Sequence, residues 1–258
     1  MHIMDHPDKL QTKLYLIPVG LTAENGCDWI GAHGRATISV LRRFVVENPK
    51  SARQFLKTLG MPLQELEFEV LDEHSKPQDL DRLAGWLESG GDVGLLSEAG
   101  CPAIADPGAL LARRAHRLGI QVIPLIGPCS IVLALMASGL NGQQFAFNGY
   151  LPQSSAQRVA SIRDLEERSR KLDQTQIFIE APYRNDALFS AITTACKPET
   201  SLSLATDLTS PMEEIRTKSI HQWRQDPPPQ LHKRPTVFLL LADRPQSANR
   251  RSRAANAQ

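Results

Sequence analysis

The chain has 258 residues, of which 41% are hydrophobic and 22% are charged, and its formal net charge is +1. This composition is typical of a globular protein, and it excludes a disordered chain, a fibrous repeat and a polyelectrolyte that binds nucleic acid through its overall charge. The length is sufficient for two domains, each with its own hydrophobic core.

The N-terminal segment, residues 1–13, mixes charged and polar side chains and lacks the apolar centre of a secretory signal. We expect it to be flexible. No apolar stretch of the chain approaches the roughly 20 residues that cross a bilayer. The sequence therefore predicts a cytoplasmic protein without a membrane span.

From residue 14 onward, short apolar runs rich in β-branched residues alternate with helical patterns. The runs are typical of buried strands and cover 14–19, 44–47, 68–71, 93–97 and 122–126. The helical patterns end at glycines and cover 51–59, 77–87 and 109–118. Alternation of this kind predicts a mostly parallel sheet with helices on both faces.

The second half of the chain predicts a smaller set of elements. A wholly apolar helix at 130–138 is expected to close the first core, so we place a domain boundary within 149–155. Strands are expected at 145–151, 176–180, 201–206 and 236–242, and helices at 156–171 and 185–196.

The predicted fold is therefore α/β with two α/β domains and a ligand cleft between them. The N-terminal domain, 14–148, has a mostly parallel sheet with flanking helices, and the C-terminal domain, 149–243, has a mixed sheet with helices. The last segment, 244–258, is basic and is expected to be disordered.

The four cysteines predict neither a metal site nor a redox motif. They form no Cys-x-x-Cys pair and have no histidine at ligand spacing. Such scattered cysteines are typical of reduced, buried thiols.

The stretch 93–108 is the most informative part of the sequence. A buried strand leads into a loop of small residues and two prolines before the next helix, and a Gly-Pro turn, 126–130, follows the next strand. Ligands of open α/β sheets bind at the carboxyl ends of the strands, so both loops are placed for binding. A tight structural connection is the alternative. The dinucleotide-binding and P-loop glycine motifs are missing from the sequence.

The chain resembles the tetrapyrrole methylase superfamily from residue 14 to about residue 242. Gly100-Cys101-Pro102 matches the Gly-Asp-Pro loop of that superfamily, with Cys in place of Asp, and Gly127-Pro128-Cys129-Ser130 matches its second Gly-Pro turn. The resemblance implies S-adenosylmethionine as cofactor, a cleft between two α/β domains and a homodimer. It implies donor contacts from Pro18, Ser97, Ala99, Gly100, Cys101, Pro102, Ile104, Ala105, Asp106, Gly127, Pro128, Ser130 and Tyr183.

Within the superfamily, the chain is most similar to the branch of small-subunit rRNA cytidine 2'-O-ribose methyltransferases. Ordered matches to that branch stand at 97–102, 105–108 and 180–184. Two segments depart from it. Pro18-Val-Gly-Leu replaces Pro-x-Gly-Asn, and Glu47-Asn-Pro-Lys replaces Glu-Asp-Thr-Arg.

These departures leave three functions open. The first is methyl transfer to rRNA ribose, the second is methyl transfer to a tetrapyrrole or another small molecule, and the third is binding of the donor without turnover. An RNA enzyme needs a basic face. A sequence cluster could provide one, although a solvated helix surface is the alternative: Arg42, Arg43, Lys50, Arg53 and Lys57.

Three carboxylates are candidates for catalysis. Glu98, Glu47 and Glu180 each follow a predicted strand. A ribose hydroxyl is a poor nucleophile that benefits from a general base, and Glu98 is the first choice because it precedes the Gly-Cys-Pro turn. For each carboxylate the alternative is a structural hydrogen bond that fixes a loop.

Overall fold

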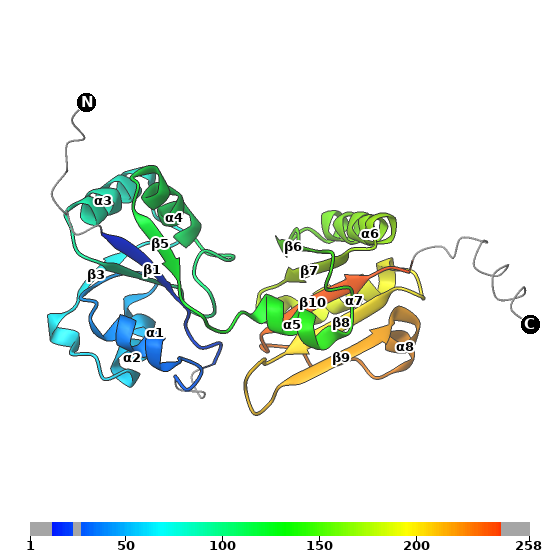
Figure 1. Ribbon diagram of the computed structural model, residues 1–258. Helices are drawn as coiled ribbons and strands as arrows, with labels where there is room; N and C mark the ends of the chain where they lie inside the picture. The colour runs from blue at the N-terminus through cyan, green and yellow to red at the C-terminus, as the bar shows by residue number, and fades with distance from the viewer. Residues whose placement is uncertain (1–11, 23–26, 244–258) are drawn as a thin grey trace, which may run out of the picture. The chain divides into compact units, whose positions relative to one another are not determined.

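The computed structural model describes residues 12–22 and 27–243 (Figure 1). The chain divides into two compact units between Cys129 and Ser130. The predictions for 1–11 and for the basic tail 244–258 lie outside the described residues. Within the described ranges, no helix combines the length and the apolar character that a membrane span requires.

The first unit holds a five-stranded sheet in which every pairing is parallel. Its order is β3-β2-β4-β1-β5, and the strands are β1 (Lys13–Ile17), β2 (Arg43–Val46), β3 (Glu67–Val70), β4 (Val93–Leu96) and β5 (Gln121–Pro124). The helices are α1 (Ala32–Ser39), α2 (Pro49–Thr58), the short 3₁₀ turn η1 (Leu63–Glu65), α3 (Pro77–Glu88) and α4 (Gly108–Arg117).

The two faces of this sheet carry separate cores. Residues of α1 and α2 pack with one set of strand side chains, which includes Phe44 and Leu96. Residues of α3 and α4 pack with the alternate set, which includes Val45 and Leu95. Figure 1 shows the two helix pairs on opposite sides of the sheet. Burial on both faces explains the almost continuous apolar runs of the central strands.

The strand order creates a switch point at β4. This strand lies between β2 and β1, whose following helices cover one face, whereas α4, which follows β4, covers the other. Loops that leave neighbouring parallel strands toward opposite faces leave a crevice at the carboxyl ends of those strands. The loop after β4 therefore occupies the position at which open α/β sheets bind ligands.

The second unit holds a mixed sheet of order β6-β7-β10-β8-β9, in which only β6 and β7 pair in parallel among the named pairings. Its strands are β6 (Phe145–Tyr150), β7 (Thr175–Ile179), β8 (Ser201–Thr206), β9 (Glu214–Ser219) and β10 (Thr236–Leu241). The helices are α5 (Ser130–Ser138), α6 (Ser155–Leu172), η2 (Pro182–Arg184), α7 (Asn185–Ala195) and α8 (Ile220–Gln225). The predicted fold class of two α/β domains, one parallel and one mixed, is confirmed.

The predicted boundary between 148 and 149 differs from the observed division. The apolar helix α5 packs on β8, β9 and β10, and β6 pairs with β7, so both elements belong to the second unit. The apolar composition of a helix predicts that the helix packs on a core, but it does not predict which of two neighbouring sheets the helix covers. The prediction assigned it to the preceding sheet because that sheet was the nearer one in sequence.

Candidate functional site

The loop from Ser97 to Pro107, which follows β4, is joined to the end of β1. Val19 and Gly100 form an isolated antiparallel bridge in which each backbone N–H donates to the other residue's carbonyl at 2.9 Å. The Ser97 side chain is buried and its hydroxyl donates to the carbonyls of Ala99 and Gly100 at 3.3 Å. The predicted donor loops therefore begin from a fixed backbone.

Three residues of the β4 loop have a positive φ, namely Gly100 at 74°, Ala103 at 68° and Ala105 at 61°. The two alanines occupy a region that residues with a Cβ rarely adopt, and such strain clusters at ligand-binding and active sites. Ile104, between the two alanines, is 45% exposed. The loop thus turns a large apolar side chain toward solvent while its backbone stays fixed.

Asp106 holds this conformation from within the loop. Its carboxylate accepts the N–H of Ala103 at 2.9 Å and that of Gly108 at 2.7 Å. Burial raises the pKa of Asp106, and the two N–H donors oppose that rise. Asp106, which is predicted to contact the donor, thus shapes the loop after β4 through these hydrogen bonds.

The Gly-Pro turn after β5 packs against the loops after β1 and β4. A Cβ at Gly127 would lie 2.3 Å from Cβ of Pro18 and 2.8 Å from the Trp29 ring, so glycine is required by this close approach. The Cys101 thiol donates to the Pro128 carbonyl at 3.3 Å. The structure therefore brings together the predicted donor segments at Pro18, at Gly100-Cys101-Pro102 and at Gly127-Pro128.

Glu47 and Glu98 lie next to each other at the carboxyl ends of β2 and β4. The Glu98 backbone N–H donates to Glu47 Oε2 at 3.2 Å, and Asn48 Nδ2 donates to Glu98 Oε1 at 2.8 Å. Asn48 is also the N-cap of α2, where its Oδ1 accepts the Lys50 N–H. Glu98 is exposed and Glu47 is half-buried. Glu98 is thus the more accessible of the two carboxylates. Asn48 orients its side chain, and Glu47 holds its backbone N–H.

A small pocket of about 190 Å³ lies beside Glu98 on the α2 side of the loop. Its volume is below the usual range for a whole small-molecule site, so it accommodates a fragment of a ligand. Thr22 Oγ1, in its wall, is buried and has no hydrogen-bond partner among the described residues. Most of the remaining wall consists of small, hydroxyl, amide and aromatic side chains: Val19, Gly20, Leu21, Ser51, Gln54, Phe55, Thr58 and Ala99.

The charge balance around Glu47 predicts a pH-dependent effect of Glu47→Gln. Burial raises the pKa of Glu47 and the carboxylates of Asp106, Glu98 and Glu73 raise it further, whereas the Glu98 N–H lowers it. A raised pKa means that the charged form opposes folding at pH values above it and that this cost disappears at acidic pH. Glu47→Gln should therefore melt at a higher temperature than the wild type at pH 7.5, and the difference should shrink toward pH 4.

Thermal melts of both proteins at the two pH values test this expectation. Glu88→Gln is the control, because Glu88 is exposed on α3 and its substitution removes one charge outside this cluster. A difference in melting temperature between Glu47→Gln and the wild type that stays constant between the two pH values would contradict the raised pKa of Glu47.

The remaining predicted site residues, Ser130, Glu180 and Tyr183, belong to the second unit. The Glu180 side chain is fully buried and its Oε1 accepts the Ala181 N–H at 2.8 Å and Arg184 Nε at 3.0 Å. Glu180 Oε2 is buried without a partner among the described residues. Tyr183 is 64% exposed, and the Arg184 guanidinium lies over its ring. Glu180 therefore fixes Arg184, and Tyr183 presents an exposed ring.

Much of the predicted basic cluster is engaged by the protein itself. Arg43 donates to the carbonyl of Trp86 at 2.8 Å and its guanidinium lies over the Trp86 ring, while Arg53 lies over Phe68. Lys50 and Lys57 are exposed on α2. Arg42 is exposed and pairs with Glu65, and Arg53 is exposed as well. Arg43 is thus held by packing, whereas the other four members of the predicted cluster are exposed.

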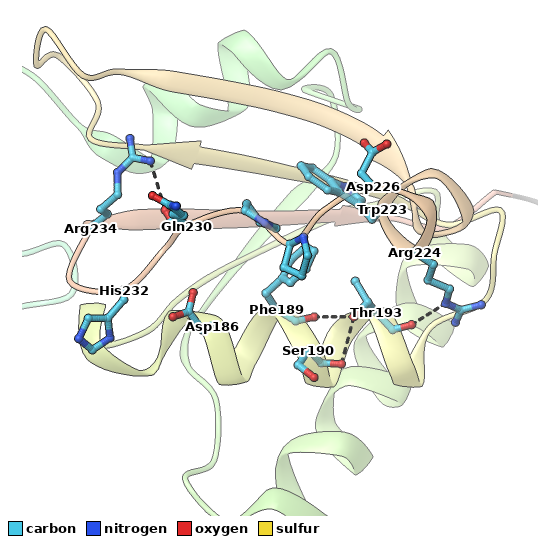
Figure 2. Close-up of a pocket in the computed structure, with 12 residues that line it drawn as sticks. Asp186, Phe189, Ser190, Thr193, Trp223, Arg224, Asp226, Gln230, His232 and Arg234 are labelled. Atoms are coloured by element: carbon cyan, nitrogen blue, oxygen red, sulfur yellow. Dashed lines mark hydrogen bonds between the residues drawn. The ribbon is translucent and has the colours of Figure 1, made fainter.

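Sequence patterns did not predict the larger pocket of the second unit, which has a volume of about 780 Å³ (Figure 2). It lies between α7 and the segment that follows α8. Charged side chains in its wall already form hydrogen bonds with the backbone. Arg224 donates to the carbonyls of Thr193 and Cys196 at 2.8 Å, and Asp186 accepts the Leu231 N–H at 3.1 Å. We assign it no ligand.

Solved structures share this fold at low sequence identity. The methyltransferase CobJ superposes with a TM-score of 0.62 at 16% identity, covering 90% of this chain and 95% of that one. Diphthine synthase superposes with a TM-score of 0.64 at 14% identity, covering 90% of each chain. A Thermus thermophilus uroporphyrin-III C-methyltransferase complexed with S-adenosyl homocysteine gives 0.56 at 13% identity, covering 89% of this chain and 97% of that one.

Relatives in sequence define the family. Ribosomal RNA small subunit methyltransferase I of Mesorhizobium japonicum is 30% identical over 213 residues, which are 82% of this chain and 68% of the relative. The Pseudomonas aeruginosa protein of the same name is 36% identical over 154 residues, which are 58% of this chain and 53% of that protein. The chain belongs to the ribosomal RNA small subunit methyltransferase I family.

This membership confirms the resemblance to small-subunit rRNA methyltransferases that the motifs predicted, and the solved structures share the fold. The match spans only about half the length of the Pseudomonas relative, at 53%. No protein-family model matches the sequence.

Proposed function

We propose that the protein transfers a methyl group from S-adenosylmethionine to a ribose 2'-hydroxyl of small-subunit rRNA. One observation carries the proposal: in a member of this family, three loops of small residues converge at the switch point of the parallel sheet, beside an exposed glutamate. Small-molecule methylation and donor binding without turnover are the alternative outcomes of the experiment below.

The residues of the converging loops fit such a donor. Gly127 lets the turn after β5 approach Pro18 and Trp29 closely, and Ile104 and Ile126 are exposed at 45% and 95%. Exposed isoleucines on loops of small residues suit a ligand with a flat apolar base and a polar tail. When bound, S-adenosylmethionine supplies an electrophilic methyl group on its sulfonium.

We assign to Glu98 the role of accepting the proton of the reacting hydroxyl. Methyl transfer is an in-line displacement that depends mainly on positioning, and a hydroxyl nucleophile gains from a group that accepts its proton. Glu98 Oε2 has no partner among the hydrogen bonds of the described residues, whereas Oε1 is held by Asn48. The fixed oxygen orients the carboxylate, and the second oxygen is available for the acceptor.

The pocket beside Glu98 is the place where we expect part of the acceptor nucleotide. Its hydroxyl and amide groups match the hydrogen-bonding groups of a sugar or a base edge, and the Phe55 ring adds an apolar wall. We also propose that the enzyme acts in the cytoplasm as a homodimer, as the resemblance implies. Light scattering after size-exclusion chromatography tests the dimer.

A methylation assay tests the proposed function. Small ribosomal subunits from cells that lack this methyltransferase are incubated with the protein and radiolabelled S-adenosylmethionine, and the RNA is digested to nucleosides. We expect label in 2'-O-methylcytidine. Label in an added tetrapyrrole but not in RNA, or donor binding without transfer to either, would overturn the proposed acceptor.

A further inference from the structure

Two cysteines from different loops meet in the first unit. Cys101 follows Gly100 in the loop after β4, and Cys129 ends the loop after β5. The Cys101 thiol donates to the carbonyl of Pro128, the neighbour of Cys129, at 3.3 Å, and its Sγ lies 4.0 Å from the carbonyl oxygen of Gly127. Both cysteines are partly exposed, whereas Cys27 and Cys196 are buried.

We propose that Cys101 and Cys129 are a site of reversible oxidation, at which a peroxide converts the two thiols into a disulfide that links the β4 loop to the β5 loop. The Cys101 sulfur already lies against the backbone next to Cys129, so a rearrangement of these two adjoining loops can bring the sulfurs to the S–S bond length of about 2.05 Å. Partial exposure gives a small oxidant access to them.

The reaction balances with one peroxide molecule. One thiolate attacks a peroxide oxygen, the O–O bond breaks, and a sulfenic acid forms with release of water. The second thiol then attacks the sulfenic sulfur, the S–O bond breaks, and a second water leaves. The two thiols lose two electrons and two protons, and the peroxide is reduced to two waters.

The environments of the two thiols assign their roles. Burial, with a smaller contribution from Cys129, raises the pKa of Cys101 to about 11, so Cys101 keeps its proton at neutral pH. We therefore assign the first attack on peroxide to Cys129, and Cys101 resolves the sulfenic acid.

The disulfide would alter the converging loops, a consequence that rests on the proposed function. The Cys101 thiol would no longer donate to the Pro128 carbonyl, and the turn would shift toward Gly100. Gly127 has no room to absorb this shift, because even a Cβ there would lie 2.3 Å from Pro18. The loops must rearrange, so we expect the oxidised protein to bind the donor with a larger Kd than the reduced protein.

Peptide mapping tests the disulfide without any assay of activity. Reduced wild-type protein is treated with hydrogen peroxide, free thiols are alkylated, and the digest is analysed by mass spectrometry. We expect a Cys101–Cys129 cross-linked peptide that dithiothreitol abolishes, with Cys27 and Cys196 alkylated as internal controls. In Cys101→Ser, Cys129 should instead be labelled by dimedone as a sulfenic acid.

Two results would overturn the inference. One is that Cys101 and Cys129 are both alkylated after peroxide treatment, and the other is that each is oxidised separately to a sulfinic acid. Calorimetry with S-adenosylhomocysteine separates this inference from the proposed function. Binding to the reduced protein with no cross-link overturns only the thiol site, whereas a cross-link with no binding to the reduced protein overturns the donor assignment.

Discussion

Glu98→Gln is expected to lower the single-turnover rate of methyl transfer by about 10²–10⁴-fold, the usual cost of losing a general base. Glutamine keeps the size of the side chain and can still accept the hydrogen bond from Asn48 Nδ2, so the fold and the loop should be retained. The donor affinity should change much less than the rate. The measurement compares the rate with saturating donor, the melting temperature and the Kd for S-adenosylhomocysteine.

Glu88→Gln is the matched control, since this exposed residue lies on α3 and should leave all three quantities unchanged. A Glu98→Gln protein with an unchanged rate, or with a rate that falls only as far as its folded fraction, would show that Glu98 fixes the loop. The catalytic role would then move to Glu47, since Glu180 is fully buried and paired with Arg184.

Arg184→Leu is expected to destabilise the second unit by about 3 kcal/mol, at the lower end of the cost of breaking a buried ion pair. The Glu180 side chain is fully buried and one of its oxygens already lacks a partner, while the Arg184 side chain is 21% exposed. Leucine would leave the carboxylate with only the Ala181 N–H among its present donors. Hydrogen exchange of peptides from the second unit, measured across a urea series, gives the local free energy of unfolding.

Asp81→Asn, measured in the same way on peptides of the first unit, provides the comparison, because it removes the carboxylate of an ion pair whose acid is 71% exposed and should cost less than about 1 kcal/mol. The double variant Glu180→Gln/Arg184→Leu should recover part of the loss, since no buried charge remains unpaired. Equal costs for Arg184→Leu and Asp81→Asn would contradict this assignment of Glu180.

Sequence patterns predicted well the strands that are buried, because burial requires apolar residues and these form a recognisable run. The strands β1, β2 and β4 are buried on both faces, so their apolar runs identify them. The strand β9 was missed because it is a sheet-edge strand of sequence Glu-Ile-Arg-Thr-Lys-Ser, and its pairing with β8 carries no apolar signal. Hydrophobic periodicity indicates burial, and none of the β9 residues is fully buried.

The candidate site was predictable where it follows from strand ends. Parallel strands end at one edge, so Glu47 and Glu98 could be expected there, and the structure places them in contact. The small pocket was not predictable, because its walls come from segments 19–22, 51–58 and 98–99, which are distant in sequence. The approach of Cys101 to the backbone next to Cys129 likewise depends on the packing of two loops, which spacing does not reveal.

Calorimetric titration of S-adenosylhomocysteine into the reduced wild-type protein is the most direct measurement of whether the loops at 97–106 and 127–130 bind the donor. We predict saturable binding to one site per chain, which is weakened when Gly127 is replaced by valine in a protein that remains folded. If millimolar S-adenosylhomocysteine and S-adenosylmethionine both produce no binding heat with folded wild-type protein, the donor assignment is wrong, and with it the proposed methyl transfer.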